Sequence, residues 1–341
     1  MLTATRAAFN RYLDQQAALN GVDVETVRHG KAFTVEPSIQ QKLIDKQMES
    51  SAFLSAINIV PVTEQSGEAL GLGVGSTLAS RTNTATTDRA TQDPSTLDAL
   101  GYLCKQTNSD THMTYAKLDM WAKFKDFQTR VTAQIIKQQA LDRIMIGFNG
   151  VSAAVATDRA TYPLLQDVNI GWLQKLRAFD TGSHVLSEGT VEADKIIIGA
   201  DGDYKNIHAV VADAVHNLLP SWGRNDAELV AILGVDLLHD TFFPLINSDL
   251  MPTESIAADL ILGAKRVGGK KAATVSSFPA NSILITRLDN LSIYEQDGKR
   301  RRTVVDNAKR DRVETYESSN DAYVIEDYDF ACLVENIEFA A

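Results

Sequence analysis

The sequence predicts an α+β fold, and three observations support that prediction. Apolar side chains recur at three- and four-residue spacing from 117 to 147, the period of a helix much longer than average. The segment 61–112 is rich in Gly and Thr but poor in large apolar residues. From 281 onward the pattern changes to short strand-like runs. A long helix, an extended segment without core residues and a strand-rich end therefore predict helical and sheet elements in separate parts of the chain.

Residues 1–60 predict an N-terminal arm. Phe9, Leu13 and Ala17 lie at helical spacing, and a second amphipathic run follows Pro37. The stretches around both runs are polar, so the two helices offer too little apolar surface to fold alone. We expect the arm to pack on another part of the protein.

Residues 61–112 predict an extended β ribbon. Glycines alternate with Leu72 and Val74 between 71 and 75, and a Thr-rich stretch follows from 80 to 96. A segment this long without core residues is uncommon inside a compact domain, and Thr favours extended backbone. Because a two-stranded ribbon is only marginally stable alone, we expect it to lie against a neighbouring copy of the chain. Arg81 and Arg89 are its expected contact residues.

The run from 117 to 147 predicts a helix of about 30 residues, which would be about 45 Å long at 1.5 Å per residue. Its apolar face includes Trp121, Phe124, Val131 and Ile135. From about 165 to 280 strand and helix patterns alternate, with helices expected at 204–219, 235–246 and 254–267 and a buried strand at 228–233. The strands that follow occupy 281–318, with runs at 282–288, 291–296 and 302–305, and 319–341. Asp297-Gly298 predicts a hairpin turn between two of them.

No catalytic or cofactor-binding group is predicted. The glycines at 71–75 lack the spacing and the following helix of a dinucleotide or phosphate loop. Asp201 and Asp203 lack the downstream ligands of a calcium loop, and no histidines lie at zinc-site spacing. Cys104 and Cys332 are far apart in sequence and are expected to be reduced, buried thiols. No apolar run approaches the length that spans a bilayer.

The formal net charge of -11 argues against a protein that grips nucleic acid by neutralising phosphates. The main basic run is Lys299, Arg300, Arg301 and Arg302, placed at the tip of the predicted hairpin. Three interpretations are open for this run: ion pairs with acidic residues such as Asp306 and Glu314 of another copy, a solvated tip, or phosphate binding. The first is expected, because the chain is acidic and offers many partners.

Long stretches of the sequence resemble the major capsid proteins of Peduovirus-type, phage P-two-like tailed bacteriophages. The resemblance is carried in order by KAFTVEPS (31–38), ESSAFLSAINIVPV (49–62), LDMWAKFKDFQTRV (118–131), MIGFNGVSAA (145–154), LLQDVNIGWLQKLR (164–177), ITRLDNLSIYEQDGKRRR (285–302) and DRVETYESSNDAYVIEDY (311–328).

The resemblance implies the Hong Kong 97-type capsid fold. In that fold the segments would be an N-terminal arm at 1–60, an E-loop at 61–112, a peripheral domain with its spine helix at 113–164 and an axial domain at 165–280. Peripheral strands with a hairpin loop at 281–318 and terminal strands at 319–341 would complete it. Some relatives cross-link their shells through an E-loop lysine, but this chain has no lysine between Gln47 and Cys104, so we expect a non-covalent shell.

The resemblance also implies the function. Copies would form hexamers and pentamers that close into an icosahedral shell around double-stranded DNA, with a scaffolding protein and a portal as partners during assembly. Assembly would take place in the host bacterial cytoplasm and the product would be the virion capsid. The alternatives are another shell of the same fold, such as an encapsulin-like compartment or a gene-transfer particle, and a soluble α/β enzyme with a cleft at 190–265.

Overall fold

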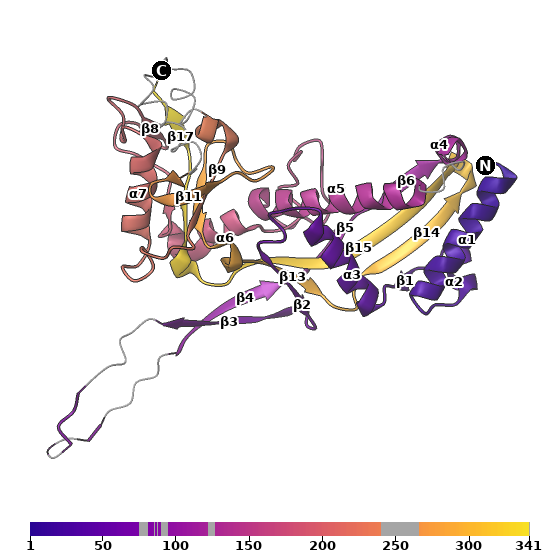
Figure 1. Ribbon diagram of the computed structural model, residues 1–341, viewed down its shortest axis with the longest axis horizontal. Coiled ribbons are helices and arrows are strands. Elements are labelled where there is room, and N and C mark those ends of the chain that lie inside the picture. The colour runs from indigo at the N-terminus through magenta and orange to yellow at the C-terminus, as the bar shows by residue number, and fades with distance from the viewer. Residues whose placement is uncertain are drawn as a thin grey trace, which may run out of the picture.

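The computed structural model describes residues 1–74, 81–84, 86, 88–89, 95–121, 127–239 and 266–340. The chain forms an elongated body with two sheets, from which a thin two-stranded ribbon projects (Figure 1). Helices and strands both build this body, so the predicted α+β class is confirmed.

The larger sheet is organised around one long strand, β15 (Arg312–Ile325). On one edge it pairs antiparallel with β14 (Arg301–Asn307) and β13 (Leu291–Gln296), and on the other edge with β6 (Thr111–Thr114) and β5 (Lys105–Asn108). The register fixes these edges, because Ser318 pairs with both Arg301 and Asn108. β1 (Phe33–Thr34) and β2 (Asn58–Val62) extend the sheet beside β14 and β13.

The predicted hairpin at Asp297-Gly298 is wrong. β13 and β14 do not pair with each other but follow one another along the same edge of β15. Gly298 takes a left-handed φ of 67°, so the four residues between the strands form a bulge in a continuous edge. The hairpin of this region is instead β14–β15, and it turns through the short helix Ala308–Arg310 with Asp311 in the left-handed conformation.

The second sheet has the order β10-β11-β9-β12-β16-β7. Its strands are β10 (Arg266–Val267), β11 (Lys270–Ala273), β9 (Val230–Leu233), β12 (Ile283–Thr286), β16 (Ala331–Val334) and β7 (Val185–Leu186). Helix α7 (Ile207–Leu218) packs on it through Val210, Val211 and Ala214, which are fully buried. β8 (Ile196–Ile198) and β17 (Ile337–Phe339) form a small parallel pair beside it.

The spine of the larger sheet is α5 (Phe127–Asn149), preceded by α4 (Tyr115–Trp121). Figure 1 shows α5 lying along β14 and β15. Its C-terminal end meets α6 (Trp172–Ala178) so closely that a Cβ at Gly147 would come within 2.2 Å of the Trp172 ring. Glycine is therefore required there, and the buried Trp172 joins the end of the long helix to the core between the two sheets.

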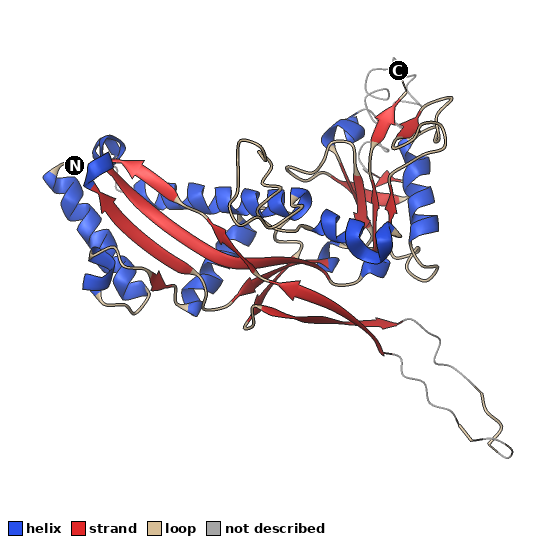
Figure 2. Cartoon of the chain, turned by 180° about the vertical axis from the view of Figure 1, so that it is seen from behind, coloured by secondary structure: helices blue, strands red, loops and turns tan. Residues whose placement is uncertain are grey.

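The arm forms α1 (Thr3–Leu19), α2 (Val24–Arg28) and α3 (Pro37–Glu49). The predicted helices at both positions are confirmed, and Pro37 occupies the first turn of α3, where its missing N–H costs nothing. As seen from behind in Figure 2, α1 and α2 lie at the end of the larger sheet that is farther from the second sheet, whereas α3 lies closer to the middle of the body.

Several sequence predictions have other outcomes. The predicted long helix corresponds to α4 and α5, with Phe124 and the rest of 122–126 outside the described residues. Most of the expected helix at 254–267 also lies outside them, and its last two residues form strand β10. β12 lies in the second sheet, although it was expected among the peripheral strands at 281–318.

Candidate assembly surfaces

The ribbon is formed by β3 (Ser66–Val74) and β4 (Ser95–Leu103), which pair over nine residues each. Among the described residues neither strand hydrogen-bonds to any further strand. At its base the Tyr102 ring packs edge-on against Tyr294 of β13, with 5.0 Å between centroids. The Tyr294 hydroxyl donates to the carboxylate of Glu326, so the base of the ribbon is fixed to the sheet while the rest projects away from it (Figure 1).

The arm covers the outer end of the larger sheet. Leu13 and Ala17 of α1 are buried against Val304 and Val313 of the β14–β15 hairpin. Arg6 also forms an ion pair with Asp306, whose other oxygen accepts a hydrogen bond from the Tyr115 hydroxyl. The first two helices are therefore held by one apolar stripe and by polar contacts with exposed or half-exposed partners.

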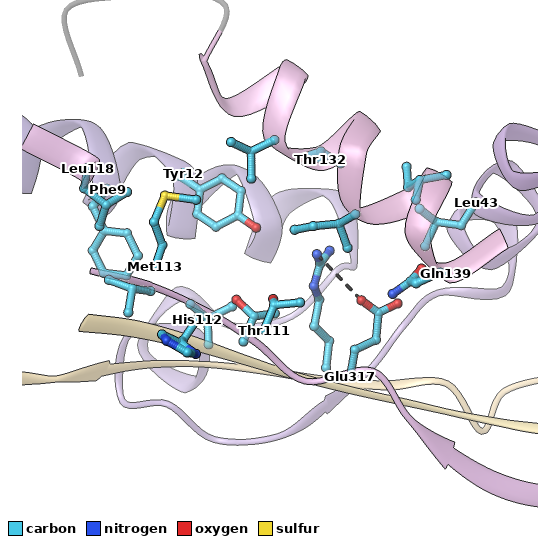
Figure 3. A pocket seen from close by; sticks show the side chains of 17 residues that line it. Phe9, Tyr12, Leu43, Thr111, His112, Met113, Leu118, Thr132, Gln139 and Glu317 are labelled. Carbon is cyan, nitrogen blue, oxygen red and sulfur yellow. Dashed lines mark ion pairs between the residues drawn. The ribbon is translucent and has the colours of Figure 1, made fainter. Parts of the chain in front are cut away.

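A half-open cavity of about 380 Å³ lies under the arm, between α1, α3, α5 and the sheet. Phe9, Tyr12, Leu43 and Val131 line it with other mostly apolar side chains (Figure 3). Interiors normally pack to high density, so the contact between the arm and the spine helix is incomplete along this stretch.

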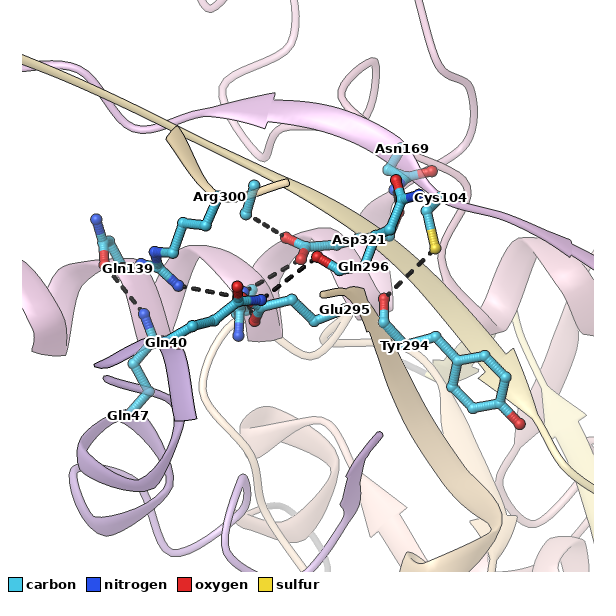
Figure 4. A network of polar contacts seen from close by, with 12 residues as sticks. Gln40, Gln47, Cys104, Gln139, Asn169, Tyr294, Glu295, Gln296, Arg300 and Asp321 are labelled. Atoms are coloured by element: carbon cyan, nitrogen blue, oxygen red, sulfur yellow. Dashed lines mark hydrogen bonds and ion pairs between the residues drawn. The ribbon is translucent and has the colours of Figure 1, made fainter. Parts of the chain in front are cut away.

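Where α3, α5 and the bulge meet, the protein buries a network of charges (Figure 4). Arg143 of α5 donates from Nη2 to Glu295 at 2.5 Å and to Asp321 at 3.2 Å. Arg300 in the bulge pairs with Glu317 at 2.5 Å and with Glu295 at 3.3 Å. The network fixes the long helix to β13 and β15 beside the bulge.

Two glutamines bring the arm into this network. Gln40 of α3 donates to Glu295 at 2.9 Å, and Gln47 donates to Gln139 of α5 at 3.0 Å. Gln139 also accepts from Arg300 at 3.4 Å. The arm is therefore joined to the body by buried amide groups as well as by apolar packing.

The charges set the protonation of the buried carboxyls. Burial alone would raise the pKa of Glu317, but the guanidinium groups of Arg300 and Arg302 outweigh it and hold that pKa below its ordinary value. In the same way Arg143 and Arg300 outweigh burial and lower the pKa of Glu295. Burial dominates at Asp321, whose pKa is raised because burial and the nearby carboxylate of Glu295 together outweigh the charge of Arg143.

The basic run that the sequence places at one exposed tip is divided by the structure. Arg300 is buried with its partners inside the same chain, so its predicted contact with another copy is wrong. Arg302 is half-buried and contacts Gln16 and Glu317. Lys299 and Arg301 are exposed.

The remaining predicted contact residues lie in different surroundings. Asp306 contacts Arg6 of the arm, and Glu314 is buried and accepts from Arg312 and Tyr316 at 2.6 Å each. Arg81 and Arg89 are exposed on the described part of the chain between β3 and β4. Val131 and Ile135 of α5 line the cavity under the arm, and Trp121 ends α4.

Sequence reasoning missed the buried network and the true hairpin tip. A signal for the network exists, because Arg143 interrupts the apolar end of a helical run and Glu295 interrupts an apolar strand. No such signal separates Lys309 and Arg310, which are exposed at the hairpin tip, from the basic run at 299–302.

The described residues contain no group of three or more His, Cys, Asp or Glu side chains placed to hold a metal ion. Within the same residues, no helix is long and apolar enough to cross a membrane. Cys104 and Cys332 are both free and buried, as predicted, and burial raises the pKa of the Cys104 thiol to about 11.

Comparison with known proteins identifies this architecture. The family model described as phage major capsid protein, P2 family, matches residues 8–337. The chain belongs to the P2 family of phage major capsid proteins. It is 47% identical to the capsid protein of Escherichia phage P2, over 99% of this chain and 96% of that protein. It is 41% identical to the major capsid protein of Serratia phage KSP20, over 100% of this chain and 98% of the relative.

Solved structures agree with this membership of the P2 family. A chain of the satellite phage P4 procapsid that includes the size determination (Sid) protein matches with a TM-score of 0.81 and 44% identity, covering 100% of this chain and 99% of that one. The capsid of an empty GTA particle has a TM-score of 0.52 at 18% identity, over 86% and 90% of the two chains, and shows the fold alone. The fold is the Hong Kong 97-type capsid fold, and the chain is a structural capsid subunit of a tailed phage.

Proposed function

We propose that copies of this subunit form hexamers and pentamers that close into an icosahedral shell around double-stranded DNA. The observation that carries the proposal is the ribbon β3–β4, which leaves the body without a supporting strand among the described residues. Two-stranded ribbons are marginally stable in water, and their open edges invite further pairing. A neighbouring copy would supply the missing surface, and the same contact repeated about a rotation axis closes a ring.

Exposed cations would supply the polar contacts between copies. Arg81 and Arg89 lie beyond β3, Lys299 and Arg301 flank the buried Arg300, and the hairpin tip presents Lys309 and Arg310. The chain carries a net charge of -11, so each of these cations would find acidic surface on the next copy. The hairpin tip therefore joins Lys299 and Arg301 in the contact that the sequence assigned to 299–302, and Arg300 drops out of it.

Each segment of the chain has its own place in the proposed shell. In this proposal residues 1–60 are the arm, 61–112 the E-loop, and 113–164 with most of 281–318 the peripheral domain. Residues 165–280, with β16 and β17 of the terminal segment 319–341, are the axial domain. The arm would contact a scaffolding protein or the inner wall, and the axial domains would surround the capsomer axis. Assembly would take place in the host cytoplasm with a portal at one vertex, and the acidic shell would enclose DNA without gripping it.

The decisive experiment shortens the ribbon. Gly67 and Tyr102 are paired, so residues 68–101 can be replaced by an Asn-Gly turn without straining the base. We expect the full chain to form megadalton particles by light scattering, and the shortened chain to stay a small folded species with unchanged circular dichroism. Closed shells from the shortened chain would overturn the role of the ribbon. A full chain that forms only a stable dimer under assembly conditions would overturn the shell itself.

A further inference from the structure

A small half-open pocket lies beside the charge network, at the point where the arm, the spine helix and the large sheet meet. It offers about 20 Å³ to the centre of a water molecule. Gln47 of α3, Arg143 of α5 and Asp321 of β15 line it, together with Thr107 of β5 and Arg300 of the bulge. About 10–15 Å³ measured in this way is enough for one water molecule and too little for a larger ligand.

Two buried polar atoms of this lining have no partner among the described residues. They are Nη1 of Arg143, which can only donate, and Oε1 of Gln47, which can only accept. Buried polar groups in folded proteins are almost always paired, and a charged donor most of all. Both orphaned atoms belong to side chains that are more than nine-tenths buried.

The orientation of the Gln47 amide follows from its neighbours. Oε1 of Gln139 accepts from Arg300, which has no acceptor, so the amide of Gln139 cannot be reversed without losing that bond. Gln47 must therefore present its Nε2 to Gln139, as observed at 3.0 Å, and its Oε1 is left for another donor.

We propose that this space holds one structural water molecule, which accepts from Nη1 of Arg143 and donates to Oε1 of Gln47. A metal cation does not fit, because the Arg143 donor faces the same space. An anion does not fit either, since Asp321 and the Gln47 oxygen line it. Water both donates and accepts, and Thr107, Ser319 and Asp321 of the same lining carry hydroxyl or carboxylate oxygens that offer it further partners.

The water would be a further link between the arm and the body. α3 otherwise reaches the network through Gln40 and through the Gln47–Gln139 bond. The water adds a second contact of Gln47, to Arg143. The guanidinium of Arg143 in turn donates to Glu295 and to Asp321. The position of the arm and the pairing of the buried charges are then coupled through one molecule of solvent.

The test is a structure of the full-length protein, as assembled shells or crystals, at a resolution that shows ordered water elsewhere in its interior. We expect a density peak within hydrogen-bond distance of both Arg143 Nη1 and Gln47 Oε1. An empty space in such a map overturns the proposal, and so does a peak at the shorter distances of a metal ion.

Two substitutions of Gln47 separate the water from the neighbouring amide bond. Gln47→Met removes the acceptor and should remove the peak, whereas Gln47→Glu keeps an acceptor and should retain it although the bond to Gln139 is lost. Gln41→Met, at an exposed position of the same helix, is the matched control and should leave the peak unchanged. A peak of equal height in Gln47→Met would show that Gln47 does not hold the water. If that variant does not fold, the maps of the unaltered protein and of Gln47→Glu still show whether the water is present.

Discussion

Arg143 of α5 and Glu295 of β13 form an ion pair 2.5 Å long with both side chains buried. Glu295 is the last residue but one of β13, and Arg300, the last residue of the bulge that separates β13 from β14, also pairs with it. The pair therefore fixes the long helix to the sheet where the edge of the sheet changes register.

Arg143→Met should destabilise the subunit strongly. Removing one partner of a buried pair leaves an uncompensated charge, at a cost of about 3–5 kcal/mol. The measurement is the free energy of unfolding of the unassembled subunit in urea. Arg130→Met, at an exposed position of the same helix, is the control and should change that free energy by less than about 0.5 kcal/mol. Equal losses in the two variants would contradict the importance of the network.

The subunit should lose stability in acid, in part through Glu317. Its pKa in the folded protein lies below the ordinary 4.5, so the folded state binds the proton more weakly than the unfolded chain. This contribution to stability is fully present above about pH 4.5, and it is lost as the pH falls through the lowered folded pKa.

Glu317→Gln tests this contribution. The variant should be less stable at neutral pH, and its unfolding free energy should depend less steeply on pH between about 5 and 3 than that of the unaltered chain. Parallel pH curves for the two proteins would argue against a lowered pKa at this residue.

Charge reversal should have different effects at the buried Arg300 and at the exposed hairpin tip. Arg300→Glu places a third carboxylate beside Glu295 and Glu317, and we expect an unfolded or aggregated subunit. The double change of Lys309→Glu and Arg310→Glu alters only exposed side chains, so the subunit should stay folded but fail to form shells. Melting curves and sedimentation velocity distinguish the two results. Normal shells from the tip variant would remove the hairpin tip from the proposed contacts.

Gly67→Ala should disturb the base of the ribbon. An added Cβ would lie 2.9 Å from the Tyr102 ring, so the ring would have to leave its place against Tyr294. Moving a packed ring off its rotamer costs about 1 kcal/mol. That free energy corresponds to a several-fold loss of affinity in each contact between copies that depends on the direction of the ribbon.

Gly101→Ala is the matched control for this change. Gly101 lies in the other ribbon strand, and its added Cβ would meet nothing closer than 4.0 Å. Shell yield by sedimentation should fall for Gly67→Ala and stay unchanged for Gly101→Ala. Equal yields would mean that the Tyr102–Tyr294 contact does not direct the ribbon.

The sequence by itself determined the elements whose signal is local. Helical spacing at Phe9, Leu13 and Ala17 identified α1, and the scarcity of large apolar residues after 61 identified the ribbon. The strand at 291–296 was found at its full length from its apolar residues. In each case the periodicity of neighbouring residues or the local composition carries the information, so no knowledge of distant parts is needed.

The tertiary structure alone decided what Asp297-Gly298 does and where Arg300 lies. The dipeptide has the composition of a hairpin turn, but β15 is long enough to pair with the strands on both sides of it, and that pairing turns the dipeptide into a bulge. Arg300 belongs to a basic run and is expected at the surface. It is buried because Glu295 and Glu317, brought together by the same pairing, compensate its charge. Strand pairing and buried charge compensation join residues that are distant in sequence, and local patterns do not contain that information.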